Sequence, residues 1–125
     1  MRMPGKALAT WVVALLVALP VSAQRIENPQ ALRVQGDALA QFRVLRGDAP
    51  EQHYPPEARR NGVDGFVTVD VMINEDGKVL EAQVISESPR EQGFGLAALD
   101  TAKTLEFDNP LRRWVVFTLN IEFLP

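Results

Sequence analysis

The sequence lacks the side chains on which many functional sites depend. It contains no cysteine and only one histidine, His53, among its 125 residues. Without cysteine the chain can form neither disulfides nor thiolate metal sites, so apolar burial must stabilise the fold. A single histidine without an acidic cluster beside it cannot assemble an ordinary zinc site, and no glycine-rich phosphate-binding loop is present. We therefore expect no metal ion and no cofactor.

Positive charge is also scarce. The chain has 13 Lys and Arg side chains against 16 Asp and Glu side chains, and its formal net charge is −3. This balance argues against nucleic acid and against anionic lipid head groups as partners. The sequence offers no recognisable set of a nucleophile, a general base and an orienting group, so we do not expect an enzyme. Its function should instead be the binding of a partner.

The first 23 residues have the pattern of a secretory signal peptide. Met1–Lys6 carries two positive charges, the uncharged run Ala7–Leu19 follows, and Pro20 precedes small residues that end at Ala23. This order predicts cleavage after Ala23 and a periplasmic protein. The alternative is a retained inner-membrane anchor with the rest of the chain facing the periplasm. Spanning a membrane takes about 20 apolar residues, and this run is shorter.

Residues 24–53 have the pattern of a short linker. Leu39, Phe42 and Leu45 recur there at helical spacing, which predicts an optional short helix over residues 38–46. Because its apolar stripe must be buried, we expect this helix to pack on the folded domain. The alternative is that it covers a sheet edge or a second subunit.

Residues 54–125 contain the patterns of three strands and two helices. Alternation of apolar and polar residues predicts a hairpin and a third strand, over residues 66–73, 79–86 and 115–123. Proline and glycine signals and apolar residues at helical spacing predict two helices, over residues 55–62 and 92–105. Each strand has one apolar face, which both helices can cover from one side. The expected fold class is α+β, with a three-stranded antiparallel sheet and two helices on one face.

The two faces of the predicted sheet differ in polarity. In the hairpin the inward residues are expected to be Val67, Val69, Val71, Ile73, Leu80, Ala82 and Val84. The carboxylates of Asp70, Glu81 and Glu122 share the outer face, where we expect solvated surface rather than an acid/base pair. Trp114 and Phe66 either form an exposed aromatic patch on that face or pack beneath a neighbouring loop or the predicted linker helix.

The order of these patterns resembles the carboxy-terminal domain of the TonB family, and the resemblance covers residues 54–125. The matching positions are Tyr54-Pro55, Ala58, Gly62, Gly65-x-Val67, Asp76-Gly77-x-Val79, Ser86, Ser88, Ala97-Ala98 and Phe107-x-x-Pro110. Two features depart from the family pattern. Residues 24–53 lack the long proline-rich spacer of the classical transducers, and Arg112-Arg113-Trp114 replaces a glycine-containing turn before the third strand.

The resemblance implies a periplasmic binding module. In the family the third strand is a sheet edge, to which a short segment of a TonB-dependent outer-membrane receptor, the Ton box, adds as a further strand. This docking serves energy-coupled transport of siderophore-type or similar substrates. The partner-binding residues implied on that strand are Val115, Val116, Phe117, Thr118, Leu119, Asn120 and Ile121. The residues just before Tyr54 would be secondary contacts, namely Glu51, Gln52 and His53.

The same edge also admits other partners. Inner-membrane motor proteins would be partners only if the leader is retained. Unpaired sheet edges readily pair with each other, so the alternative is a homodimer or an envelope interaction module without energy transduction. Independently of the partner, we expect His53 to be a surface loop residue, with a receptor contact as the alternative.

Overall fold

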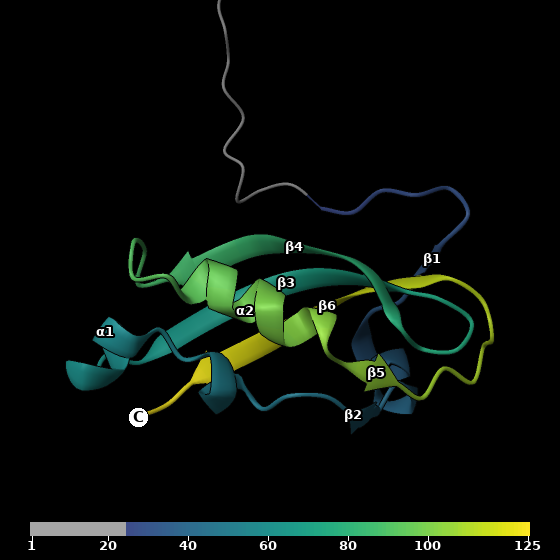
Figure 1. The fold of residues 1–125 in the computed structure, drawn as a ribbon. Helices are drawn as coiled ribbons and strands as arrows, with labels where there is room; N and C mark the ends of the chain where they lie inside the picture. Colours follow the sequence, from purple (N-terminus) through teal and green to yellow (C-terminus); the bar gives the residue numbers. More distant parts are fainter. Residues whose placement is uncertain (1–24) are drawn as a thin grey trace, which may run out of the picture.

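The computed structural model describes residues 25–125, so the predicted signal peptide over residues 1–23 lies outside the described residues. The elements in chain order are β1 (Leu32–Arg33), a 3-10 helix (Gly36–Gln41), β2 (Val44–Arg46), a second 3-10 helix (Pro50–His53), α1 (Pro56–Arg60), β3 (Gly65–Ile73), β4 (Val79–Ser88), α2 (Phe94–Lys103), β5 (Glu106–Phe107) and β6 (Val115–Phe123). Four strands form one sheet in the order β1-β6-β3-β4, and β2 pairs with β5 in a two-stranded sheet. Figure 1 shows α2 lying across one face of the larger sheet.

The inner face of the sheet, which α2 covers, holds the main core. Val67, Val69, Val71 and Ile73 of β3 are fully buried there, as the period-two pattern predicts. Aromatic rings close the core at both ends of β6. Phe94 of α2 lies 5.3 Å from the ring of Phe123, and Phe107 of β5 lies 5.1 Å from the ring of Phe117. Each fully buried side chain of this size contributes roughly 1.5–3 kcal/mol.

The hairpin of β3 and β4 forms as predicted, except that β4 runs to Ser88 instead of ending at Ser86 and that Leu80 is placed differently. Asn74–Lys78 makes the turn, in which Gly77 adopts a φ of 85°. In the register of the pair, Met72 faces Glu81 and Ile73 faces Val79. Leu80 is therefore an extra residue in a bulge, and its side chain is 46% exposed. The prediction that Leu80 faces the core is wrong, because a bulge shifts the alternation by one residue.

The segment expected to form a helix over residues 38–46 is folded differently. Only Gly36–Gln41 is helical, as a 3-10 helix, and Val44–Arg46 is the strand β2. Phe42 between them is buried and stacks on Phe117 at 5.4 Å. Val44 pairs with Phe107 of β5, which requires an extended backbone and ends the helix early. Leu45, the last residue of the predicted stripe, is 52% exposed.

The larger sheet has one more strand than predicted. β6, β3 and β4 are antiparallel as expected. β1 adds to the far side of β6 in the parallel direction, with Leu32 beside Val115 and Arg33 beside Val116. The sheet is therefore mixed and four-stranded rather than purely antiparallel. A strand of two residues leaves no alternation in the sequence from which it could be recognised.

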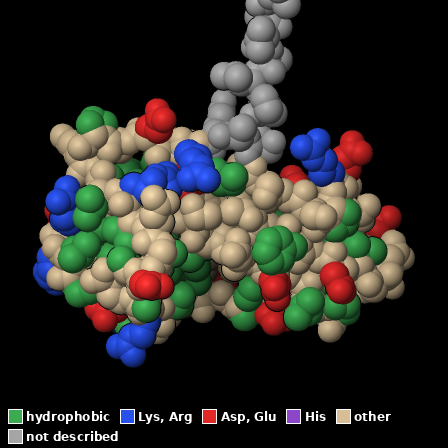
Figure 2. Space-filling model, turned by 180° about the vertical axis from the view of Figure 1, so that it is seen from behind, with side chains coloured by type: hydrophobic (Ala, Val, Ile, Leu, Met, Phe, Trp, Pro, Cys, Tyr) green, Lys and Arg blue, Asp and Glu red, His purple; other side chains and the backbone are tan. Residues whose placement is uncertain are grey.

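The outer face of the sheet differs most from the expectation. Figure 2 shows this face, on which apolar side chains and charged side chains of both signs are interspersed. Glu81 and Glu122 are exposed there, but Asp70 is fully buried. The chain before β1 covers Asp70, and Ile26 from this segment packs with Met72 and Val116 in a small outer cluster. The prediction that Asp70 is solvated is wrong, because a segment distant in sequence covers it.

Asp70 is held by four hydrogen bonds. Arg33 binds it through both terminal nitrogens, Nη2 to Oδ2 at 2.6 Å and Nη1 to Oδ1 at 3.1 Å. The Ile26 N–H donates to Oδ2 at 2.9 Å, and the Thr118 hydroxyl donates to Oδ1 at 2.9 Å. A buried carboxylate requires such partners, since burial without them would be costly.

These contacts also set the pKa of the pair. Burial alone would raise the pKa of Asp70, but the hydrogen bonds from Arg33, Ile26 and Thr118 and the charge of Arg33 outweigh it, so that the pKa is lowered. The pKa of Arg33 is raised, chiefly by its hydrogen bond to Asp70.

The first prediction concerns the close contact between β3 and α2. A Cβ atom on Gly65 would lie 2.3 Å from Cδ1 of Phe94, a ring held in the core. We expect Gly65→Ala to destabilise the fold by about 1–3 kcal/mol, because the ring or the strand must move. Gly95→Ala is the matched control, since its added Cβ meets only the flexible end of Glu87. Urea unfolding of both variants checks this, and equal midpoints would contradict it.

The second prediction concerns acid stability. Because the pKa of Asp70 is lower in the folded state than the unfolded value of about 3.9, its contribution is fully present above about pH 4 and disappears as the pH falls through the folded pKa. At pH 7 we expect Asp70→Asn to lower the free energy of unfolding by about 1–3 kcal/mol. This deficit should shrink at about pH 3.

Urea unfolding at the two pH values measures the change in the deficit. Asp100→Asn is the control, because Asp100 is exposed on α2 and should change stability little at either pH. A deficit of Asp70→Asn that stays constant with pH would show that the charge of Asp70 does not stabilise the fold.

Candidate partner-binding edge of the sheet

The two sides of β6 differ in how fully they are paired. Towards the middle of the sheet, β6 pairs with β3 over its whole length, from Gly65 beside Phe123 to Ile73 beside Val115. On its other side, β1 covers only Val115 and Val116. Within residues 25–125 no strand pairs with that side of β6 from Phe117 onwards. We call the stretch Phe117–Phe123 on this side the free edge.

The bonds to β1 show which backbone groups point to the free edge. The N–H groups of Leu32 and Val34 donate to the carbonyls of Trp114 and Val116, at 3.0 and 2.9 Å. Successive residues of a strand point their backbone groups to opposite sides. The N–H and C=O groups of Thr118, Asn120 and Glu122 therefore also point outwards. Those of the residues between them point to β3.

The side chains along the free edge are mostly engaged within the fold. Phe117 and Ile121 are buried on the inner face. On the outer face the Thr118 hydroxyl binds Asp70, and the Asn120 Oδ1 accepts a hydrogen bond from Thr68 at 3.2 Å. Leu119 is half-buried against the core. The free edge thus offers backbone groups to a partner more than side-chain chemistry.

The predicted secondary contacts lie in the 3-10 helix Pro50–His53, which packs against both α2 and β6. Gln52 Oε1 accepts the Ala49 N–H at 2.8 Å, so this side chain caps the turn. His53 Nε2 lies 2.8 Å from Asp48 Oδ2. Glu51 accepts a hydrogen bond from Arg59 through its carbonyl, and its side chain is exposed. The structure places these residues beside β6, and two of the three side chains hold the turn itself.

Tyr54 joins this turn to the end of β6. Its ring is buried against Phe94 and Phe123, and its hydroxyl donates to the carbonyl of Val63 and, at 3.5 Å, to that of Phe123. Burial and the charge of Asp64 raise the pKa of Tyr54. The start of the predicted domain and the end of β6 are therefore fixed to each other, which keeps the 3-10 helix beside the strand.

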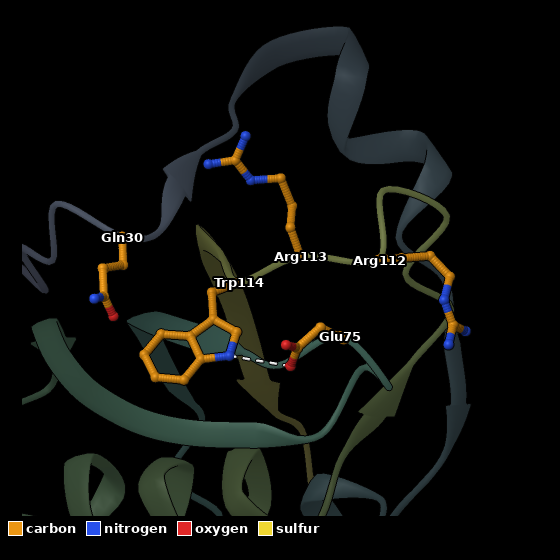
Figure 3. A pocket seen from close by; sticks show the side chains of 5 residues that line it. All are labelled: Gln30, Glu75, Arg112, Arg113 and Trp114. Atoms are coloured by element: carbon orange, nitrogen blue, oxygen red, sulfur yellow. Dashed lines mark hydrogen bonds between the residues drawn. The ribbon is translucent and has the colours of Figure 1, made fainter.

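An open pocket of about 550 Å³ lies at the start of β6, lined by Gln30, Glu75, Arg112, Arg113 and Trp114. Figure 3 shows the Trp114 indole beneath Gln30, with its N–H donating to Glu75 Oε1 at 3.1 Å. Trp114 packs on the outer cluster with Ala31, so it lies beneath the chain before β1 rather than beneath the linker helix. Phe66 lies at the other end of β3 and is 42% exposed. The two aromatic residues do not form one patch.

Arg112 occupies the position where the family pattern has a glycine-containing turn. Its φ is 52°, in the left-handed region that favours glycine. Its side chain is exposed and lies 3.9 Å from Asp76. The segment before β6 thus turns with an arginine in a backbone conformation that suits glycine.

Sequence reasoning missed β1 and the buried Arg33–Asp70 pair. An arginine and an aspartate 37 positions apart carry no local signal that they meet.

In the described part of the chain, no three His, Cys, Asp or Glu side chains gather in a way that could hold a metal ion. None of the helices between residues 25 and 125 is long and apolar enough to span a membrane.

Comparisons with known proteins agree with this architecture. The family model for the Gram-negative bacterial TonB protein C-terminal matches residues 50–124. The solution NMR structure of the Pseudomonas aeruginosa TonB CTD is similar in fold, with a TM-score of 0.51 and 22% sequence identity over 74% of this chain and 92% of that chain. No curated protein sequence matches the chain significantly.

The family match covers more than half of the chain. In this family the domain is a periplasmic, non-enzymatic part of an energy transducer. The matched region contains the free edge, the turn before Tyr54 and most of the core beneath α2, whereas β1, the first 3-10 helix and the core residues Val34 and Phe42 precede it. The chain belongs to the family of the Gram-negative bacterial TonB protein C-terminal domain.

Proposed function

We propose that the free edge of β6 binds the Ton box of a TonB-dependent outer-membrane receptor as an added strand. The observation that carries this proposal is the run from Thr118 to Glu122, whose outward backbone groups have no strand partner within residues 25–125. Strand addition needs such groups and little else, because main-chain hydrogen bonds supply most of the affinity. The engaged side chains of this run are consistent with that mode.

The length of the free edge limits how tightly a strand can bind. Three residues present outward N–H and C=O groups, and each hydrogen bond contributes a net of about 0.5–1.5 kcal/mol. After the entropy cost of ordering an extended segment, weak and reversible binding remains. Reversible binding suits a transducer domain that engages a receptor, passes on force and releases it. The 3-10 helix over residues 50–53 lies beside β6 and supplies further contacts through the exposed Glu51 side chain.

In this proposal the domain acts in the periplasm, in energy-coupled transport of siderophore-type or similar substrates. Coupling to an inner-membrane motor requires that the leader over residues 1–23 is retained as an anchor. Residues 26–46 do not serve as a flexible spacer, because they pack on the domain through Ile26, Val34 and Phe42, which are all buried.

Self-association is the second candidate, and the far edge of the sheet favours it. β4 is the last strand in the sheet, so its outer side has no strand partner in the described chain. It is ten residues long and carries the 46% exposed Leu80. Two copies could pair through such edges.

The third prediction tests docking through the free edge. Asn120→Pro removes one outward N–H, and proline is tolerated where a strand faces no neighbour. We expect this variant to bind a TonB-dependent receptor from an outer-membrane extract about tenfold more weakly than wild type. The reason is that it loses one backbone hydrogen bond to the added strand and weakens the neighbouring ones. Asn120→Ala keeps the N–H and should lose far less. The captured receptor is identified by mass spectrometry, and its binding is then measured with the purified receptor.

Leu119 would be the wrong site for the proline, because its N–H points to β3 and the substitution would break the sheet. Circular dichroism and sedimentation of Asn120→Pro establish that it is folded and monomeric. Equal receptor binding by Asn120→Pro and wild type contradicts docking on this edge. A wild-type dimer that captures no receptor, and that dissociates when the outer side of β4 is blocked by Ala82→Pro, whose N–H points away from β3, would support self-association instead.

A further inference from the structure

The chain occupies part of the proposed docking edge with its own strand. β1 lies on the outward side of Val115 and Val116, two of the residues expected to bind the partner. No second strand can pair there, because the N–H groups of Leu32 and of the adjacent Val34 already bind the outward carbonyls of Trp114 and Val116. Any partner strand that extends beyond Phe117 towards the start of β6 must replace β1.

Few contacts attach β1 to the sheet. The strand is two residues long, and the side chain of Leu32 is 40% exposed. Apart from backbone bonds, the segment is held mainly by the Arg33–Asp70 ion pair and by the buried side chains of Ile26 and Val34. The Arg33 side chain keeps 30% exposure, so water already reaches one side of the pair.

Asp70 would not be left without partners if this segment detached. Its carboxylate lies on the outer face, where two of its partners, the Ile26 N–H and the Arg33 guanidinium, come from this segment. The Thr118 hydroxyl bond, which comes from β6 itself, would remain. Water would replace the donors that are lost, so detachment exposes the carboxylate instead of burying it unpaired.

The chain also has a place to bend at the start of the first 3-10 helix, after Val34, the residue of this segment that reaches the main core. Gly36 follows the strand with a φ of 70°, and no atom lies within 4 Å of a Cβ built on it. Further along, Phe42 remains stacked on Phe117 in the core. The segment before Gly36 can therefore leave the edge while the first 3-10 helix and Phe42 stay in place.

We propose that residues Ile26–Val34 are a resident strand that competes with the partner strand for the edge of β6 and is displaced when the partner docks. This inference rests on the proposed function for its role in the cell, because the competitor matters only if a strand docks there. It adds regulation to that site, because the partner's apparent affinity equals its intrinsic affinity multiplied by the fraction of molecules in which the edge is free. A variant that releases the segment should bind an added strand more tightly.

A test with a synthetic strand needs no receptor. The probe is a peptide that copies residues 25–36, added to the full-length protein labelled with ¹⁵N. Leu32→Pro removes an N–H that holds the resident strand without touching the core, and Leu32→Ala keeps that N–H. We expect the peptide to bind Leu32→Pro about tenfold or more tightly than wild type, with shifts at Val116 and Asp70. Leu32→Ala should behave much more like wild type.

Hydrogen exchange of the wild-type protein gives a second readout that needs no variant. If the segment detaches, the Leu32 and Val34 amides exchange through local opening, much faster than the Val69 amide of the central strand. Exchange of all three amides at one rate, limited by global unfolding, would show that β1 is a permanent part of the fold and would overturn the inference. So would equal peptide binding by folded Leu32→Pro and wild type.

The outcome also separates this inference from the proposed function. If Leu32→Pro binds the peptide but no variant binds a receptor, the proposal that β1 competes for the edge is supported and receptor docking is rejected. The opposite result would be equal receptor affinity of Leu32→Pro and wild type, with the β1 amides of the wild-type protein still protected from hydrogen exchange in the receptor complex. That result would support docking on the free edge and reject the proposal that β1 competes for it.

Discussion

The buried carboxylate of Asp70 is the constraint on which the outer half of this structure depends. A carboxylate in the middle of β3 cannot be covered unless donors come with the cover. The segment around β1 brings a guanidinium and a backbone N–H to it, and β6 brings a hydroxyl. Covering Asp70 in this way fixes the position of β1 on β6. The small cluster of Ile26, Met72 and Val116 forms around the same contact.

Arg33 and Asp70 explain why the sequence predicted one face of the sheet better than the other. The inner face follows from alternation within β3 and β6, where each apolar residue signals its own position, and the third strand was predicted with its observed bounds. The outer face depends on a segment that meets the sheet through an ion pair and a two-residue strand. No periodicity records such a contact, so Asp70 is indistinguishable in sequence from an ordinary solvated strand residue.

Leu80 and Leu45 show two other limits of pattern reasoning. A single bulge turned Leu80 away from the core although its neighbours Val79, Ala82 and Val84 pack against it. The spacing of Leu39, Phe42 and Leu45 is helical, yet only the first two contact the core, because the chain becomes extended to pair with β5. In both cases tertiary pairing overrides a local preference. For the proposed binding edge, the sequence indicated β6 but not which of its side chains and backbone groups are free.

The side of β6 that faces away from β3 is subject to two opposing requirements, partner binding and protection from unspecific strand pairing. A domain that binds by strand addition must leave backbone groups unpaired, and unpaired edges also invite pairing with any other strand. Among residues 25–125, β1 covers the start of the edge and leaves a run of three outward-facing residues without a strand partner, one of which is the charged Glu122. A short, partly covered edge binds random strands weakly. Under the proposed displacement, a partner that replaces β1 gains the remaining backbone bonds but must offset the contacts that β1 loses, so the cover lowers the affinity of every strand that needs the start of the edge.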